Sequence, residues 1–307
     1  MRILFMGTPD FAVASLRRLV EDGHEICGVF TQPDKPKNRG HKVAFSPVKE
    51  YALSRELPVY QPVKLRDGSA LTLVQELAPE LIVVAAYGKI LPEDILNVPP
   101  YGSINVHASL LPRYRGAAPV NRAIMGGESV TGITIMYMAK ELDAGDMLLQ
   151  SQTAIDPEET AAALMARLAH IGAQALHDAL CALQKGTAVR TPQQHHEATY
   201  APMLSREESP IDWTRPAQAI RNQVRGLIPW PCACTVLGGQ TVKVYQTAPG
   251  EATDAAPGTV LSGGKRGIEI SCGDGMSLFI TELQPEGGKR MTADAYLAGH
   301  SIETRHA

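Results

Sequence analysis

The 307-residue chain lacks the sequence patterns of several common classes of protein. Its five cysteines are odd in number and thinly spread, which argues against a disulfide framework of the kind that stabilises small secreted domains. No apolar run approaches the length of a membrane span, and the N-terminus has neither the apolar core nor the cleavage site of a signal peptide. We therefore expect a cytoplasmic protein with no membrane association.

Familiar motifs for cofactor binding and nucleophilic catalysis are also missing. The first strand-to-helix turn reads Gly7-Thr-Pro-Asp10 in place of the G-x-G-x-x-G that holds a dinucleotide, so NAD chemistry is poorly supported. The chain has no G-x-S-x-G nucleophile elbow and no cysteine–histidine pair at a recognisable site. The pairs Cys232/Cys234 and His195/His196 have no further ligand nearby at zinc spacing, and we expect no metal.

Positive charge is not in excess. The net charge is −3, so the chain has no overall field that attracts a nucleic acid, and such a partner would have to be held by a local patch. From Glu207 onward acidic residues outnumber basic ones, so the C-terminal third is not basic either.

Basic side chains are nevertheless concentrated in one short loop and on one helix. The loop runs from Asp34 to Lys42, and its proline and glycine disfavour regular structure. On a helix predicted at 216–227, Arg221 and Arg225 are four residues apart and share a face. Both groups are candidates for phosphate contacts, although a solvated surface is the more ordinary explanation of such charges. The basic residues of the loop are Lys35, Lys37, Arg39 and Lys42.

The first half of the chain alternates apolar strands with amphipathic helices. Strands are expected at 2–6, 25–31, 81–86, 103–107 and 132–138. Helices are expected at 12–20, 47–53, 71–77 and 119–125, followed by a long helix at 158–185. This order predicts an α/β domain with a mainly parallel sheet.

The C-terminal third has a different pattern. A polar segment without periodicity, 186–202, is interpreted as a linker. The helix at 216–227 is followed by short β-like runs separated by glycine-rich turns, which predicts a small barrel or sandwich of OB type. We expect residues 1–188 to form the first domain, 189–206 the linker, and 207–307 a smaller β-rich, OB-like second domain.

The strongest chemical signal is a pair of polar side chains at the end of one predicted strand. In the run Ser103-Ile-Asn-Val-His107, Asn105 and His107 lie on one face, near the carboxyl end, where open α/β sheets bind ligands. An asparagine amide can donate a hydrogen bond to a developing oxyanion, and a histidine can donate or carry a proton near neutral pH. A purely structural role is equally consistent with these residues alone.

A carboxylate in a glycine-containing turn completes the candidate set. Asp143 lies in Leu142-Asp-Ala-Gly145 and, taken alone, is most simply a turn or cap residue. Beside a histidine, however, a carboxylate can fix the imidazole tautomer and stabilise its charged form. Together, Asn105, His107 and Asp143 fit acyl transfer to an amine that attacks directly, so no serine or cysteine nucleophile is needed.

Several separated motifs occur in an order that is typical of one known family. They are FMGTPDFA, VFTQPDKPKNRGHK, SPVK, VVAAYGKILP, INVHASLLPRYRGAAPVNRAI, ELDAGDMLLQ, IDWTRPA and RGLIPWPCA. With these motifs the chain resembles the folate-dependent formyltransferase family, over nearly its whole length. Within the family it is similar to the members that formylate methionine on the initiator tRNA for the initiation of translation.

The resemblance implies a Rossmann-like first domain that binds 10-formyltetrahydrofolate as the formyl donor and needs no metal. Asn105 and His107 would stabilise the oxyanion of a tetrahedral intermediate. Asp143 would orient His107 and help to move the proton of the amine, which must be neutral to attack. The resemblance places the following residues around the folate: Ser109, Leu110, Leu111, Pro112, Tyr87, Gly88, Ile90 and Leu91.

The acceptor that the resemblance implies is the free α-amine of methionine on initiator methionyl-tRNA. Arg39 matches a family position implicated in tRNA recognition. We expect the protein to be a monomer. The other expected tRNA contacts are Lys35, Lys37, Lys42, Arg221 and Arg225. Three alternatives stay open: a formyltransferase for a sugar nucleotide or another small amine, a folate- or RNA-binding module without catalysis, and a hydrolase that releases formate.

Overall fold

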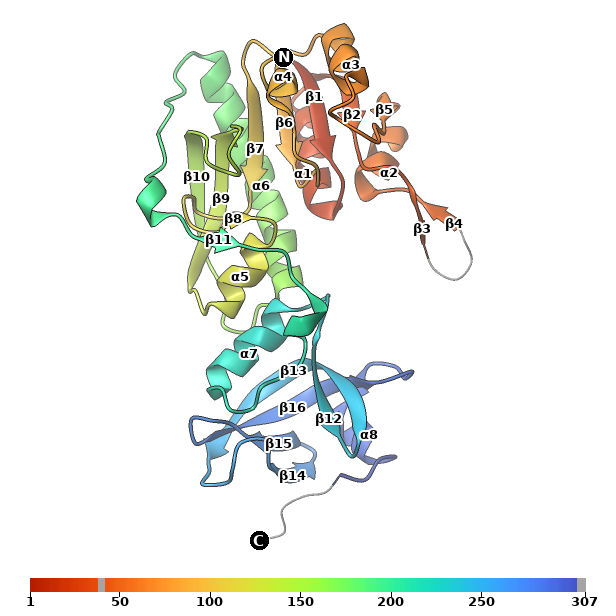
Figure 1. Cartoon of the computed structure of the whole chain (residues 1–307), viewed down its shortest axis with the longest axis vertical. Coiled ribbons are helices and arrows are strands. Elements are labelled where there is room, and N and C mark those ends of the chain that lie inside the picture. Colours follow the sequence, from red (N-terminus) through yellow and green to blue (C-terminus); the bar gives the residue numbers. More distant parts are fainter. Residues whose placement is uncertain (38–41, 303–307) are drawn as a thin grey trace. The chain divides into compact units, whose positions relative to one another are not determined.

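The structure, a computed structural model, describes residues 1–37 and 42–302. It divides into two compact units (Figure 1). The first unit comprises Met1–Pro119, Val130–Ala154 and Met165–Ala201. The second comprises Val120–Ser129, Ile155–Leu164 and Pro202–Ala307. Each unit is therefore assembled from separate stretches of sequence, and the domain boundaries expected at 188 and 207 stay a prediction.

A seven-stranded sheet forms the centre of the first unit, in the order β10-β9-β7-β6-β1-β2-β5 (Figure 1). The strands from β5 to β7 are parallel to one another, whereas β9 is antiparallel to both β7 and β10. The predicted mainly parallel α/β sheet is thus confirmed. The strands are β1 (Arg2–Gly7), β2 (Glu25–Phe30), β5 (Val59–Tyr60), β6 (Leu81–Ala85), β7 (Ser103–His107), β9 (Val130–Tyr137) and β10 (Met147–Ala154).

Helices connect and cover these strands. They are α1 (Asp10–Glu21), α2 (Pro47–Ser54), α3 (Ser69–Leu77), α4 (Glu93–Leu96) and α6 (Ala161–Gln184). A Cβ atom at Gly172 would lie 3.0 Å from Val106, so glycine there allows α6 to pack closely against β7. Because side chains alternate along a strand, this packed face is the one opposite Asn105 and His107. In the described part of the chain, none of the helices combines the length and apolarity that a membrane span requires.

The central strands are buried on both faces. Every residue of Leu81–Ala85 is buried, as its continuous apolar sequence predicts for a strand covered on both sides. Burial of each large apolar side chain contributes about 1.5–3 kcal/mol to stability. This packing makes the sheet a rigid base for the residues at its edge. One core cluster of the unit contains Leu4, Met6, Phe30, Val74, Ile82, Val84, Tyr87 and Ile95.

The polar segment 186–202 is attached to the first unit at two places. Thr191 and Met147, at the start of β10, exchange two backbone hydrogen bonds of 2.8 and 2.9 Å. Further along, β11 (Tyr200–Ala201) pairs in parallel with β8 (Arg115–Gly116). The first contact is an isolated β-bridge and the second is a strand of only two residues. Elements this short produce no hydrophobic periodicity in the sequence. The segment interpreted as a linker is therefore part of the folded first unit up to residue 201.

The second unit contains an antiparallel sheet in the order β12-β13-β16-β15-β14 (Figure 1). A further strand, β17, pairs with β16. The predicted β-rich second domain is thus confirmed. Its strands are β12 (Ala233–Leu237), β13 (Gln240–Ala252), β14 (Val260–Gly264), β15 (Gly267–Ser271), β16 (Met276–Pro285) and β17 (Met291–Thr292). A short hairpin elsewhere, in the first unit, is formed by β3 (Lys35–Lys37) and β4 (Lys42–Ala44).

The second unit contains the helices α5 (Pro119–Met125), α7 (Ala217–Gly226) and α8 (Ala293–Leu297). The predicted apolar face of α7 is buried, with Ile220, Val224 and Leu227 in the core. A Cβ atom at Gly226 would lie 2.4 Å from the side chain of Met125, so glycine allows α7 to approach α5. The short 3₁₀ turn η2 (Arg206–Glu208) is tied to α5 by an ion pair between Arg122 and Glu208.

Candidate active site

The end of β7 places Asn105 and His107 at the carboxyl edge of the first unit's sheet. The side chain of His107 is buried, being only 5% exposed. Its Nε2 atom lies 3.0 Å from the carbonyl oxygen of Tyr114, and its Nδ1 atom lies 3.7 Å from Oδ2 of Asp143. The structure therefore brings His107 and Asp143 together although 36 positions separate them in the sequence.

Both ring nitrogens of His107 face oxygen atoms. A carbonyl oxygen only accepts hydrogen bonds, so the nitrogen that faces Tyr114 carries a proton. The neutral ring then turns the lone pair of Nδ1 toward Asp143, and only the doubly protonated ring can donate in both directions. The 3.7 Å separation exceeds hydrogen-bond length, and catalytic contacts of this kind commonly shorten when substrate binds. The pair is thus arranged to accept a proton and to stabilise the cation that results.

The loop that carries Asp143 is held from several sides. Its Oδ2 atom accepts a hydrogen bond of 2.8 Å from the backbone N–H of Gly116. The backbone of Asp143 is left-handed, with φ of 49°, a region that aspartate tolerates better than most residues. A Cβ atom at Gly145 would lie 2.0 Å from the carbonyl oxygen of Tyr137, so the loop packs against β9 more closely than any side chain allows. These contacts fix the carboxylate relative to His107.

A buried glutamine that the sequence analysis did not identify, Gln193, supports the same loop. The Nε2 group of Gln193 donates hydrogen bonds of 2.8 Å to the carbonyl oxygens of both Asp143 and Gly145. Its Oε1 accepts from Nε and Nη2 of Arg115 at 3.1 and 2.7 Å. Arg115 is itself buried and also contacts Nδ1 of His195 at 3.1 Å. The sequence contained one hint of this network, because Arg115 belongs to the family motif INVHASLLPRYRGAAPVNRAI, which also contains His107.

Asn105 is half-buried on the same face of β7. Across residues 1–37 and 42–302, its side-chain amide makes no hydrogen bond to another part of the protein. An amide at the edge of a sheet that has no protein partner is available to a ligand. It can donate to an oxygen atom on which negative charge develops.

The turn from Ser109 to Pro112 follows β7 and is held by the neighbouring strands. Oγ1 of Thr134 donates to the carbonyl oxygen of Ser109 at 2.7 Å and accepts from the N–H of Leu111 at 3.1 Å. The amide of Gln150 donates to the carbonyl oxygen of Leu111 at 2.8 Å. The Leu111–Pro112 peptide is cis. The turn expected to contact the folate is therefore a fixed feature of this edge.

The loop after β6 meets two other loops at the same edge. The carbonyl oxygen of Tyr87 accepts hydrogen bonds of 3.0 Å from Thr8, after β1, and 3.1 Å from Gln32, after β2. The ring of Tyr87 packs in the core, and burial raises its pKa to about 12. Ile90 is 71% exposed, whereas Leu91 is buried. Any contact of Tyr87 with a ligand at this edge therefore goes through its backbone, as the ring points inward.

The basic residues expected to contact RNA differ in their surroundings. Lys35 and Lys37 lie on β3 and Lys42 lies on β4, while Arg39 lies outside the described residues. Arg221 and Arg225 are both engaged within the second unit. Their partners lie in the segment that precedes α6.

Arg221 forms an ion pair with Glu158, and its side chain is only 12% exposed. Arg225 donates hydrogen bonds of 3.2 and 2.9 Å to the carbonyl oxygens of Asp156 and Glu159. Burial, and then the charge of Arg221, lower the pKa of Arg225. Both arginines thus attach α7 to the segment 156–159. Direct contact of either guanidinium with a phosphate would require these bonds to break.

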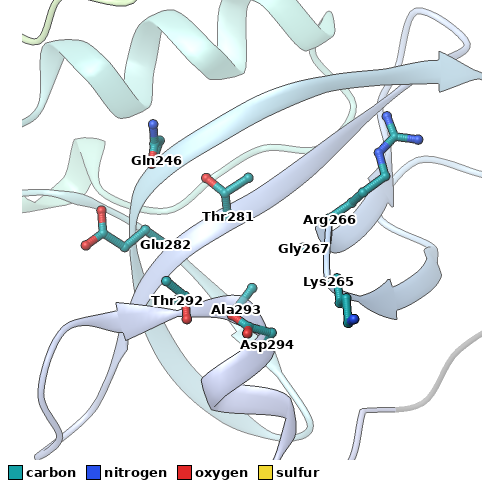
Figure 2. Close-up of a pocket in the computed structure, with 9 residues that line it drawn as sticks. All are labelled: Gln246, Lys265, Arg266, Gly267, Thr281, Glu282, Thr292, Ala293 and Asp294. Atoms are coloured by element: carbon teal, nitrogen blue, oxygen red, sulfur yellow. The ribbon is translucent and has the colours of Figure 1, made fainter.

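A cavity of about 440 Å³ lies in the second unit (Figure 2). Lys265 and Arg266 lie on one side of it and Glu282 on the other, so its charges are mixed. Glu282 is already paired with Arg290. None of the residues expected to bind folate or to carry the chemistry lines this cavity. The remaining lining residues are Gln246, Gly267, Thr281, Thr292, Ala293 and Asp294.

Two family models match the chain. Residues 1–180 match the family described as "Formyl transferase", and residues 203–301 match "Formyl transferase, C-terminal domain". The chain is also similar to curated proteins along almost its whole length. It is 47% identical to a methionyl-tRNA formyltransferase from Acetivibrio thermocellus, over 98% of this chain and 97% of that protein. It is 50% identical to one from Caldanaerobacter subterraneus subsp. tengcongensis, over 98% of each.

Solved structures share the fold at low sequence identity. An N-formyltransferase from Helicobacter canadensis, in complex with folinic acid and dTDP-3-aminofucose, superposes with a TM-score of 0.70 at 17% identity, over 91% of this chain and 98% of that one. HypX from Aquifex aeolicus in complex with tetrahydrofolic acid superposes with a TM-score of 0.64 at 20% identity, over 97% of this chain. This chain spans about half of HypX, covering 47% of its length.

Proposed function

The chain belongs to the formyl transferase family, and we propose that it transfers the formyl group of 10-formyltetrahydrofolate to the α-amine of methionine on initiator methionyl-tRNA. The observation that carries this proposal is the 47–50% identity to methionyl-tRNA formyltransferases over nearly the full length of each chain. The second domain supports it, because residues 203–301 match the family's C-terminal domain as well. We further propose that the enzyme acts as a monomer in the cytoplasm.

The role that we propose for Asn105 and His107 is to stabilise negative charge on the formyl oxygen. This charge develops as the neutral amine attacks the formyl carbon. The amide of Asn105 has no protein partner within the described residues and can donate to that oxygen. Once it is protonated, the imidazole of His107 places a positive charge near this oxygen, and its burial excludes competing water.

The role that we propose for Asp143 is to receive, through His107 or a water molecule, the proton that the amine loses. The bond from the formyl carbon to the folate nitrogen then breaks, and the same proton can return to that leaving nitrogen, so the transfer needs no other reactant. The support for this role is the 3.7 Å separation between Asp143 and Nδ1 of His107. The hydrogen bonds from Gly116 and Gln193 keep the carboxylate in place.

The folate site that we propose lies between the turn 109–112 and the loop 87–91. Both follow parallel strands at the carboxyl edge, where open α/β sheets bind ligands. The turn offers the backbone of Leu110 and the loop offers Gly88, whose φ of 81° places it in the left-handed region. The exposed side chain of Ile90 adds apolar surface for the pterin ring.

Replacement of Gln193 by alanine is expected to lower kcat for formyl transfer about tenfold, because a small displacement of the Asp143 loop is enough to misalign the reacting groups. The same change leaves Nε of Arg115 and two carbonyl oxygens without partners, and the free energy of unfolding should fall by about 1–3 kcal/mol. Steady-state kinetics and urea unfolding measure the two effects. Gln194→Ala is the matched control, since this neighbouring glutamine is exposed. Equal effects of the two substitutions would show that Gln193 has no special role.

The basic loop is expected to serve the RNA and not the folate. Arg39→Ala should raise KM for charged initiator tRNA by about three- to tenfold, as the loss of one phosphate or base contact typically does, and leave KM for the formyl donor unchanged. The tRNA effect should shrink as salt is added. Lys185→Ala is the control, because it removes a positive charge at an exposed position elsewhere in the chain. Unchanged tRNA kinetics in Arg39→Ala would remove the loop from the proposed interface.

An acceptor screen tests the function as a whole. The purified protein and 10-formyltetrahydrofolate are offered charged initiator tRNA, uncharged tRNA, an amino sugar nucleotide and free amino acids, and formylated product is quantified by mass spectrometry. We expect product with charged initiator tRNA alone. Product with the sugar nucleotide alone would make this a sugar formyltransferase, and formate without any acceptor would make it a hydrolase.

A further inference from the structure

A cysteine, a histidine and an aspartate meet at the opposite edge of the first unit's sheet. Helix α1 returns from the carboxyl edge to the amino edge, where Asp22 follows its last residue. His177 and Cys181 are one turn apart on α6, so their side chains share a face. The proposed chemistry of formyl transfer makes no use of these three residues.

The three side chains are arranged in a line. Nδ1 of His177 lies 2.7 Å from Oδ2 of Asp22, and Nε2 of the same ring lies 3.6 Å from Sγ of Cys181. Since a carboxylate only accepts hydrogen bonds, the proton of the neutral imidazole lies on Nδ1. The lone pair of Nε2 is then directed at the thiol. Nucleophile, base and orienting carboxylate occur in the same order in cysteine and serine hydrolases.

Asp22 is kept in its ionised form. Burial alone would raise its pKa, but hydrogen bonds from His177 and Arg18, together with the charge of Arg18, lower the pKa of Asp22 below its usual value. Nε of Arg18 donates to both carboxylate oxygens, at 2.9 and 3.0 Å. His24 lies beside this group, and burial and the N-terminal amine lower its pKa. The ionised carboxylate of Asp22 therefore orients the ring of His177.

Cys181 differs from the other four cysteines in its surroundings. It is half-buried, and the side chain of His177 beside it is 31% exposed, so small reagents can reach the thiol. Cys27, Cys232 and Cys272 are buried. Cys234 is half-buried, as Cys181 is, but within the described residues it contacts no histidine. Burial raises the pKa of Cys234.

We propose that Cys181 is a base-assisted nucleophilic thiol that undergoes thiol–disulfide exchange with small disulfides. Nε2 of His177 takes the proton of Sγ, and the thiolate attacks one sulfur of the disulfide. The S–S bond of that disulfide breaks, and a bond forms between Sγ and the attacked sulfur. The second half leaves as a thiolate and takes the proton back from His177, so the step balances without a further oxidant.

The first test compares alkylation rates within one protein. A limiting pulse of iodoacetamide at pH 7 is followed by peptide mass spectrometry of all five cysteines. We expect Cys181 to react at least about tenfold faster than Cys234, because the thiolate and not the thiol is the nucleophile. In denaturant the two rates should converge. Equal rates in the native protein would overturn the proposal.

Variants then test the assignment of the base. His177→Gln and Asp22→Asn should each slow alkylation of Cys181 at pH 7 by about three- to tenfold and leave Cys234 unchanged. Asp178→Asn is the matched control, because Asp178 is an exposed carboxylate on the same helix and its loss should change nothing. An equal loss in the control would mean that disturbance of α6, and not a base, sets the rate.

Oxidised glutathione serves as the disulfide probe. We expect one glutathione adduct, located at Cys181, that forms more slowly in His177→Gln and is removed by a thiol reductant. Adducts spread over Cys181 and Cys234, or formation that is indifferent to His177, would contradict the proposal. The readout is thiol chemistry alone, so its outcome does not depend on whether the enzyme formylates tRNA.

Discussion

Replacement of His107 by alanine is expected to lower kcat for formyl transfer by about a thousandfold or more and to leave the protein folded. The change removes both the positive charge that stabilises the developing oxyanion and the group that passes the amine proton to Asp143. Each of these contributions typically accounts for about a hundredfold or more. Single-turnover kinetics with saturating folate and charged tRNA measure the chemical step itself.

Asp143→Asn separates the charge of the carboxylate from its shape. The amide oxygen can still accept from the N–H of Gly116, so the loop should keep its position, while kcat falls about a hundredfold or more because the proton acceptor is lost. His196→Ala is the control, since that histidine is 78% exposed and forms no part of the site. Near-normal turnover in either His107→Ala or Asp143→Asn would refute the assigned mechanism.

Gly145→Ala is also expected to have a large effect, although it removes no functional group. The added Cβ atom would lie 2.0 Å from the carbonyl oxygen of Tyr137, so the backbone of one strand or of the loop must move. Overpacking of this kind costs about 1–3 kcal/mol of stability. Displacement of the loop moves Asp143 from His107, and a shift of about 1 Å can lower kcat about a hundredfold.

The control for this prediction is a glycine with free space. Gly264→Ala adds a methyl group where no other atom lies within 4 Å, and the backbone there is not left-handed. Its kcat and its midpoint of urea unfolding should match the unmodified protein. If Gly145→Ala retained full activity, the Asp143 loop would be more adaptable than its packing indicates.

The sequence predicted those features that depend on local periodicity. The central strands occur close to the expected residues because their continuous apolar runs, such as 81–85, require burial on both faces. The long helix followed from a sequence rich in alanine and leucine and free of proline, and the apolar face of α7 followed from spacing. Alternation along a strand also predicted that Asn105 and His107 share a face. Local periodicity could not predict contacts between residues that are distant in the sequence.

Features that depend on tertiary contacts are not marked by any periodicity in the sequence. β10 was not predicted because it is an edge strand whose second half alternates exposed and half-buried residues. Gln193 lies in a polar segment and becomes important only through its bonds to Asp143 and Gly145. Arg221 and Arg225 share a face, as spacing predicts, but spacing did not reveal that both would bind the segment 156–159.

The interleaving of the two units restricts how this protein can exchange parts with its relatives. Helix α5 belongs by sequence to the first half, yet Asn121 donates to the carbonyl oxygen of Gly226 at 2.7 Å and Arg122 pairs with Glu208. A recombination event at residue 201 would give α5 a foreign partner at both contacts. A C-terminal domain should therefore be exchanged together with residues 120–129 and 155–164, because these three segments form one folded unit. Chimaeras that exchange all three pieces together should fold where simple end-to-end fusions do not.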